Sequence, residues 1–297
     1  MYGRVSDPLS VLQISQLIDE IAIKSDDGQL ISVDILQMII FCSKEKNEEY
    51  SVELAGYCIK YLQHFDWSKF DHGNDNLTHD IAEIIDFVLQ SKIEEAEVLF
   101  ILTNFIKFER MEEHGYGYRH GKILKPFFEH FPQITLDAVL IVDEDLQFIS
   151  TLRMVSEWSG DRQETAISKI PEDAFIEWCN ISPNERYLFA AHACKLFDQV
   201  TQDTKEHLAL SNIAKRIFTN ADDRQAVVEI FISRFMPSGW SGSLVTILRG
   251  RLALLDELSY IDNQNIVNAA KSRFIKRIEI EKKREDDDER NRTGSFE

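Results

Sequence analysis

Apolar residues recur at every third or fourth position along most of this chain, and that spacing predicts amphipathic α-helices. The first stripe runs from Leu9 to Ile21 and follows Asp7 and Pro8, a capping residue and a first-turn proline. Alternation at every second position, which would indicate β-strands, is scarce. Beyond the first helix we expect helices at about 32–40, 49–65, 81–89, 93–112, 123–131, 134–141, 145–158, 172–180, 184–199, 205–219, 222–235, 243–259 and 262–289.

The number and length of these segments predict an all-α fold. About a dozen helices of roughly 10–20 residues with short connections favour a HEAT-like α-solenoid of stacked antiparallel helix pairs. Because no sequence motif repeats, a closed multi-helix bundle remains the alternative. We expect an acidic N-terminal helical-repeat section over 1–160, a second such section over 161–280 and a charged tail over 281–297.

The chain is strongly acidic, with 51 Asp and Glu against 33 Lys and Arg and a formal net charge of −18. Residues 1–120 hold 22 acidic and 10 basic residues, so most of the excess lies there. Such a charge repels phosphate groups, so we expect neither direct nucleic-acid binding nor attachment to an anionic membrane. It favours a basic protein partner, which it would attract by long-range steering.

The cysteines and the hydropathy pattern indicate a cytoplasmic protein without a cofactor or a bound metal. The four cysteines lie far apart in apolar helical contexts and have neither disulfide-framework nor zinc-ligand spacing. The first residues do not have the pattern of a signal peptide, and no stretch reaches the roughly 20 apolar residues of a membrane span. No G-x-x-x-x-G-K-[ST] loop is present, so nucleotide binding by that route is excluded.

The most distinctive stretch is the loop and helix of residues 234–258. Pro237 ends one helix, and the segment Trp240–Ser241–Gly242–Ser243 precedes the next. One interpretation is a capped helix start, with Ser241 or Ser243 as the cap and Trp240 folded onto the first turn. The other is a partner contact built on Trp240 and the small residues beside it. The serine-nucleophile motif G-x-S-x-G does not fit, because Ser243 stands in the place of its second glycine.

Four other aromatic residues are candidates for contact with a partner protein. Tyr116 and Tyr118 lie in a turn-rich break at 113–121, where exposed aromatic side chains are typical of an interface. Trp158 and Trp178 each follow a glutamate, a pair that could border a peptide groove. Packing between helices is the alternative for both tryptophans.

A cluster of imidazoles and carboxylates lies at 64–80, within and beside a polar loop. A metal-dependent enzyme of unfamiliar all-α type is the catalytic alternative that this cluster leaves open. Its spacing matches no helix-paired ligand motif, and loops collect such residues for turn formation, so we expect a solvated loop. The residues of the cluster are His64, Asp66, His72, Asp75, His79 and Asp80.

The last 128 residues carry a resemblance to a known group of proteins. The runs IPEDAFIEWCNISPNERYLFAAHACKLF and RFMPSGWSGSLVTILRGRLALLDEL, followed by a charged helix ending in ERNRTGSFE, resemble the C-terminal helical region of large bacterial NTPases of the STAND class that are linked to antiphage defence. The resemblance implies a helical-repeat sensor or scaffold that engages a partner protein, such as a defence effector or a phage protein. No NTPase module accompanies it here, and no catalytic residue is implied. A self-assembling structural subunit is the remaining alternative, so an oligomer is possible.

Overall fold

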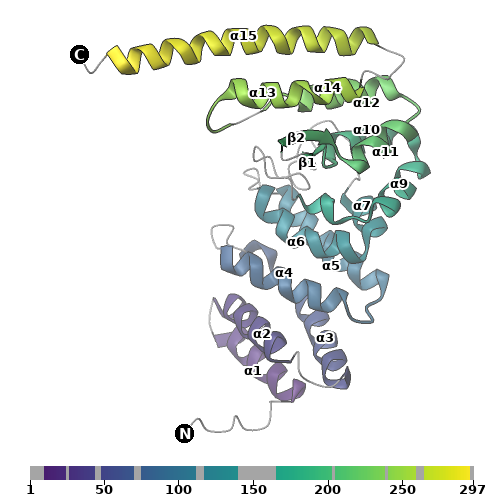
Figure 1. Ribbon diagram of the computed structural model, residues 1–297. Helices are drawn as coiled ribbons and strands as arrows, with labels where there is room; N and C mark the ends of the chain where they lie inside the picture. The colour runs from purple at the N-terminus through teal and green to yellow at the C-terminus, as the bar shows by residue number, and fades with distance from the viewer. Residues whose placement is uncertain are drawn as a thin grey trace. The chain divides into compact units, whose positions relative to one another are not determined.

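The computed structural model describes most of the chain as helices that fall into two compact units (Figure 1). Unit 1 comprises residues 1–157 with 169–171, and unit 2 comprises residues 158–168 with 172–297. The division of the sequence into sections 1–160, 161–280 and 281–297 stays a prediction. The described residues are 10–24, 27–43, 48–69, 75–111, 117–139, 165–202, 205–237, 240–258 and 264–294.

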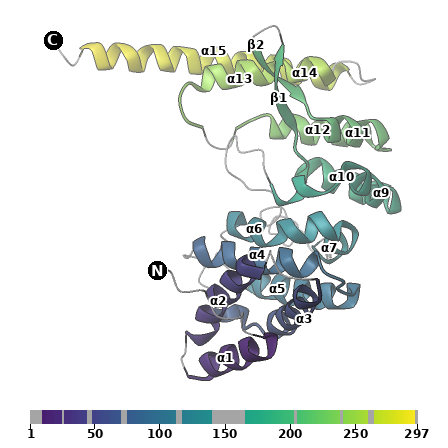
Figure 2. The same cartoon turned by 60° about the horizontal axis from the view of Figure 1, so that its bottom comes forward.

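Unit 1 is built from helices arranged in two rows. Helices α2, α4 and α6 are neighbours in one row, and α1, α3, α5 and α7 are neighbours in the other (Figures 1 and 2). Each described helix places apolar side chains between the rows, among them Leu36, Ile84, Phe105 and Phe127, which are fully buried. The bounds are α1 (Val11–Lys24), α2 (Gly28–Ser43), α3 (Glu48–Gln63), η1 (Trp67–Lys69), α4 (Asp75–Leu89), α5 (Glu95–Met111), α6 (Gly117–His130) and α7 (Pro132–Val139).

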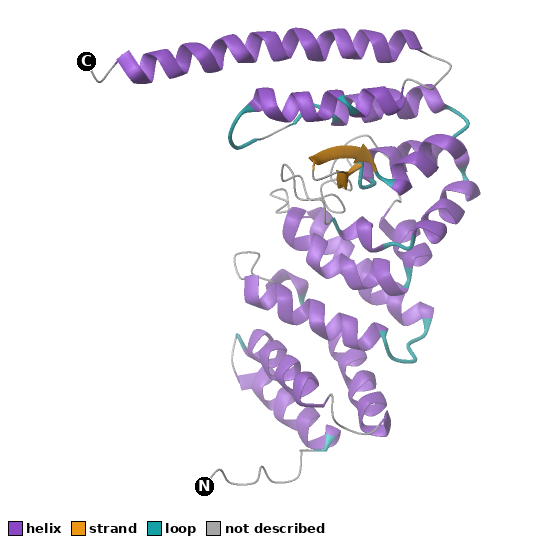
Figure 3. Cartoon of the chain, viewed as in Figure 1, coloured by secondary structure: helices purple, strands orange, loops and turns teal. Residues whose placement is uncertain are grey.

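Unit 2 contains helices and a small antiparallel hairpin (Figure 3). The strands are β1 (Phe197–Gln202) and β2 (Lys205–Leu210), with Phe197 opposite Leu210. The short helix η2 (Ala166–Lys169) precedes its first long helix. The other helices are α9 (Glu172–Ile181), α10 (Pro183–Ala193), α11 (Asn212–Asn220), α12 (Arg224–Arg234), α13 (Leu244–Leu252), the short α14 (Leu254–Glu257) and α15 (Gln264–Gly294).

The hairpin corrects two helix predictions, those for 184–199 and 205–219. Helix α10 ends at Ala193, and β1 begins at Phe197, within the range predicted as helix. Helix α11 begins only after Ser211, because the Ser211 hydroxyl accepts a hydrogen bond from the Ala214 amide and caps the helix there. The spacing of apolar residues over 205–219 therefore joined a strand and a helix into one predicted element.

Arginines tie the helices of unit 2 together at their C-terminal ends, where carbonyl groups lack partners within the helix. Arg234 of α12 donates hydrogen bonds of 2.7 Å to the carbonyls of Ala191 and Cys194 at the end of α10. Buried Arg251 of α13 donates to the Phe235 carbonyl, which follows α12, at 3.2 Å. These charge-assisted bonds fix one helix against the end of another.

The prediction of a mostly helical, all-α protein is confirmed, with the hairpin as the exception. The predicted helix at 145–158 lies outside the described residues. Helix α6 begins at Gly117, four residues inside the predicted break at 113–121. The HEAT-like solenoid, as against a closed bundle, stays a prediction. Among the described residues, no helix is both long and apolar enough to cross a membrane.

Candidate functional site

The Trp240 loop places its tryptophan at the surface. Trp240 is 49% exposed, and Ser241 and Gly242 are exposed beside it. Gly242 has a φ of +80°, a backbone conformation that residues with a Cβ rarely adopt. The loop therefore combines an accessible indole with a backbone turn that only glycine forms easily. Its role as a contact stays a prediction.

Ser243 is the helix cap in this loop, and Ser241 is not. The Ser243 hydroxyl accepts a hydrogen bond of 3.2 Å from the Thr246 amide at the start of α13. The same hydroxyl donates to the Glu285 carboxylate of α15, at 2.9 Å and 3.0 Å to its two oxygens. Glu285 also accepts a bond of 3.3 Å from the Val245 amide, so a carboxylate from α15 complements the positive end of α13. Ser243 therefore stabilises the helix start and its contact with α15.

Of the other aromatic candidates, Trp178 is the one whose side chain lies in the described part of the chain. Trp178 is only 1% exposed and packs against Phe175, Phe189 and the Arg186 guanidinium, which lies 4.4 Å from the indole centroid. Its burial makes Trp178 a core residue, so it no longer belongs among the contact candidates. Tyr116 and Trp158 lie outside the described residues. Tyr118 lies in the first turn of α6, and its side chain is outside the described part.

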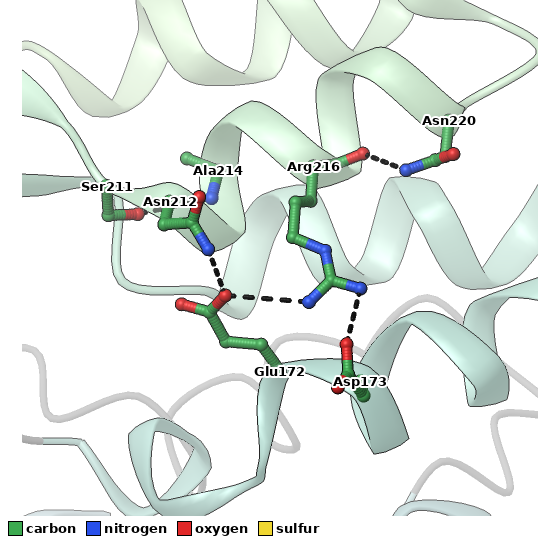
Figure 4. A network of polar contacts seen from close by, with 7 residues as sticks. All are labelled: Glu172, Asp173, Ser211, Asn212, Ala214, Arg216 and Asn220. Carbon is green, nitrogen blue, oxygen red and sulfur yellow. Dashed lines mark hydrogen bonds and ion pairs between the residues drawn. The ribbon is translucent and has the colours of Figure 1, made fainter.

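A polar network links α9 and α11 in unit 2 (Figure 4). The Arg216 guanidinium lies 2.8 Å from Asp173 and 3.6 Å from Glu172, and Asn212 donates to the same Glu172 carboxylate. These partners raise the pKa of Arg216, chiefly through the hydrogen bond to Asp173. Each charged member is matched by a group of the opposite sign or by an amide, so the network holds two helices together.

The cluster at 64–80 is only partly described. The His64 Nδ1 lies 2.8 Å from the Lys60 carbonyl at the end of α3, and the Asp66 carboxylate accepts hydrogen bonds from Ser68. His72 lies outside the described residues. Among the described residues, no group of three or more His, Cys, Asp or Glu side chains is placed to hold a metal ion.

Three of the four cysteines are buried and poorly suited to nucleophilic chemistry. Burial raises the pKa of Cys58 and Cys179 to about 12, and it also raises the pKa of Cys194. A thiol with such a pKa is protonated at neutral pH, whereas the thiolate is the nucleophile. These three side chains therefore act as small core residues.

Helix α2 has apolar side chains on two opposite faces. One set, Val33, Leu36, Ile40 and Ser43, follows 3-4-3 spacing and is buried. A second set, Ile31, Asp34, Met38 and Phe41, has the same spacing and points away from the first. In this second set, which we name the α2 face, Ile31, Met38 and Phe41 are 44%, 58% and 64% exposed. The α2 face therefore exposes apolar side chains to water on the side of the helix opposite its buried stripe.

The N-terminal half of α2 is held in place by a reciprocal hydrogen-bond pair. The Gln29 amide group donates to the Asp66 carbonyl and accepts from the Asp66 amide, both at 3.2 Å. The Tyr61 hydroxyl of α3 donates to the Gln29 carbonyl at 2.6 Å. A partner that docks on the α2 face would therefore meet a helix that is already positioned.

Carboxylates border the α2 face where α2 meets α4. Asp34 of α2 and Asp80 of α4 lie within hydrogen-bonding reach of each other, and Glu83 is a further neighbour on α4. Burial raises the pKa of Asp80, and the charges of Asp34 and Glu83 raise it further, while His79 opposes them. We name Asp34, Asp80 and Glu83 the acidic seam. Ionised carboxylates that lie this close repel each other, so the acidic seam favours the approach of a positively charged group.

The sequence contains a signal for the α2 face that spacing alone did not separate. The prediction for 32–40 was a helix with no assigned exposed face, although α2 has Asp34 as its single charged residue. A helix that is apolar all round needs burial on both sides. Counting charged residues around the helix would have identified the second face.

Comparison of the chain with family models, with curated proteins and with solved structures gives no match.

Proposed function

We propose that this protein is a non-catalytic helical scaffold that binds a partner protein, with the α2 face as the docking surface. The observation that carries the proposal is the group of exposed apolar side chains, Ile31, Met38 and Phe41, which lie with Asp34 on one face of an anchored helix. Helices with an apolar face recognise other proteins by packing that face against apolar side chains of the partner. The row formed by α2, α4 and α6 supplies a continuous support for such a contact.

Removal of the apolar groups from the α2 face tests this function. The double variant Ile31→Gln with Met38→Gln replaces two exposed side chains and leaves the buried side of α2 intact. Val52→Gln on α3 is a matched control, because Val52 is 49% exposed but lies on another helix. Each tagged full-length variant is purified from the native host, and the proteins recovered with it are quantified by mass spectrometry.

We expect a stoichiometric partner with the wild-type chain and with Val52→Gln, and its loss from the double variant. A partner recovered equally with all three proteins would contradict the α2 face as the docking surface. The antiphage setting rests on the resemblance of residues 170–297 alone. Repeating the purification with and without phage challenge tests that setting separately.

A further inference from the structure

The chemistry around the α2 face defines the kind of partner that it fits, and this step rests on the proposed function. Helices α2 and α4 together carry five carboxylates and no Lys or Arg. One of the five, Asp86, already has a partner in His130 of α6 at 2.9 Å. The acidic seam, by contrast, brings Asp34 and Asp80 together directly beside the exposed apolar side chains.

From these features we infer that the α2 face binds an amphipathic helix of another protein whose apolar stripe is flanked by Lys or Arg. The apolar stripe covers Ile31, Met38 and Phe41, and a basic side chain enters the acidic seam. That side chain offsets the repulsion between Asp34 and Asp80, which His79 opposes without cancelling it. Helix α2 has 16 residues, which corresponds to about 24 Å at the helical rise, so the matching segment is roughly four turns long.

Two other occupants fit the observations less well. A second copy of this chain would place one α2 face against another, and its acidic seam would meet carboxylates of the same sign. An anionic lipid surface is repelled by the same carboxylates. A basic helix satisfies the apolar and the charged parts of the surface together.

A panel of three synthetic peptides tests the inference. The first is an 18-residue helix with Leu at three- and four-residue spacing and Lys on both flanks. The second has the same composition in an order that scatters the Leu around the helix, and the third replaces each Lys by Glu. Binding to the full-length protein is measured by fluorescence anisotropy. The scattered peptide controls for non-specific attraction between any cationic peptide and a chain of net charge −18.

Two pairs of substitutions locate the charge effect. Asp34→Asn with Asp80→Asn neutralises the acidic seam. Glu177→Gln with Asp222→Asn makes the same change of net charge at exposed positions in unit 2. We expect the Lys-flanked peptide to lose about tenfold in affinity with the first pair and to change by less than about twofold with the second.

The results separate failure of this inference from failure of the proposed function. Tighter binding of the Lys-flanked peptide than of both controls, with loss only in the seam variant, supports the inference. Equal binding of the Lys- and Glu-flanked peptides, or equal losses in the two variant pairs, overturns it. In that case, loss of the native partner from the Ile31→Gln/Met38→Gln variant would leave the proposed function standing. A concentration-dependent dimer that Met38→Gln dissociates would make the occupant a second copy and would also overturn the inference.

Discussion

Helices α2 and α15 differ in how apolar residues are distributed around the helix. In α15, the buried residues Val267, Ala270, Phe274 and Ile278 follow one line of 3-4-4 spacing, and charged residues of both signs cover most of the remaining surface. In α2, apolar residues cover two opposite faces, and only one of them is buried in the chain. A polar outer face closes a stack of helices, whereas an apolar one leaves it open to further packing.

The buried side of α15 and the exposed α2 face should therefore affect different properties, the first stability and the second binding. The burial of α15 against α13 contributes to the stability of unit 2, because its apolar side chains are removed from water within the chain. The α2 face contributes little in this way, since water still reaches its side chains. We therefore expect substitutions on the buried side of α15 to change unfolding, and substitutions on the α2 face to change association.

The largest effect is expected for Phe274→Ala, because Phe274 is buried on the inner side of α15. Removal of a buried phenyl ring lowers the free energy of unfolding by about 3–5 kcal/mol. Chemical denaturation followed by the fluorescence of Trp178 and Trp240, both in unit 2, measures the loss. The neighbouring exposed residue supplies the control, Ile275→Ala, which should have a much smaller effect. Equal losses would contradict the orientation of α15.

A smaller loss is expected for Ser243→Ala, which removes the cap of α13 and its hydrogen bonds with Glu285. An N-cap of this kind contributes about 1 kcal/mol, so the midpoint of unfolding should fall measurably. Ser241→Ala, two residues earlier in the same loop, is the matched control. If the two alanine variants melted alike, Ser243 would not be the cap that links α13 to α15.

A small gain is expected for Asp80→Asn in the acidic seam. The pKa of Asp80 is raised above 3.8, so the folded chain keeps this proton to higher pH than the unfolded chain does. Ionisation therefore lowers stability as the pH rises through the raised pKa. Because Asp80 is partly exposed, we expect the variant to be more stable at pH 7 by about 0.5 kcal/mol or less.

Denaturation at several pH values checks both the sign and the window of this effect. The electrostatic advantage of Asp80→Asn should disappear below pH 3.8, where the carboxyl is protonated in both states. A variant that is less stable than the wild type at pH 7 would contradict the repulsion in the acidic seam.

The smallest change in stability is expected for Ile31→Gln with Met38→Gln. Both side chains are exposed, so we expect the free energy of unfolding to change by no more than about 0.5 kcal/mol per site. The melting temperature measures this change. Leu36→Gln on the buried side of the same helix is the contrasting variant and should destabilise unit 1 strongly. A large loss from the double variant would mean that the chain itself covers the α2 face.

The sequence predicted the helical class because 3-4 spacing of apolar residues is preserved in almost every element. The helix prediction was wrong at 197–210, where a hairpin lies between two helices. The apolar residues of the strands and of the helices beside them were assigned to the same predicted helices. The Ser211 cap was visible in the sequence and would have separated β2 from α11. The start of the helix predicted at 184–199 agrees with that of α10 to one residue, and Pro183 at the first position of α10 favours a helix start.

The candidate site was harder to predict, because exposure depends on which helices become neighbours. Trp178 in α9 and Trp240 in the loop before α13 were both contact candidates, yet the first is buried beside Arg186 and the second lies at the surface. Likewise, Asp34 and Asp80 are 46 positions apart in the sequence, and only the contact between α2 and α4 brings them together. Pairings of this kind are set by tertiary packing and leave no mark in local spacing.

Site-specific photo-crosslinking of the full-length protein in its native host tests most directly whether a partner docks on the α2 face. A photoreactive phenylalanine replaces Met38 on the α2 face, Trp240 in the α13 loop or Ile280 on the outer side of α15, one position at a time. We predict that position 38 crosslinks to one protein through a basic amphipathic helix, and that position 280 gives no such product. Crosslinking of that partner from position 240 or 280 but not from position 38 would contradict docking on the α2 face.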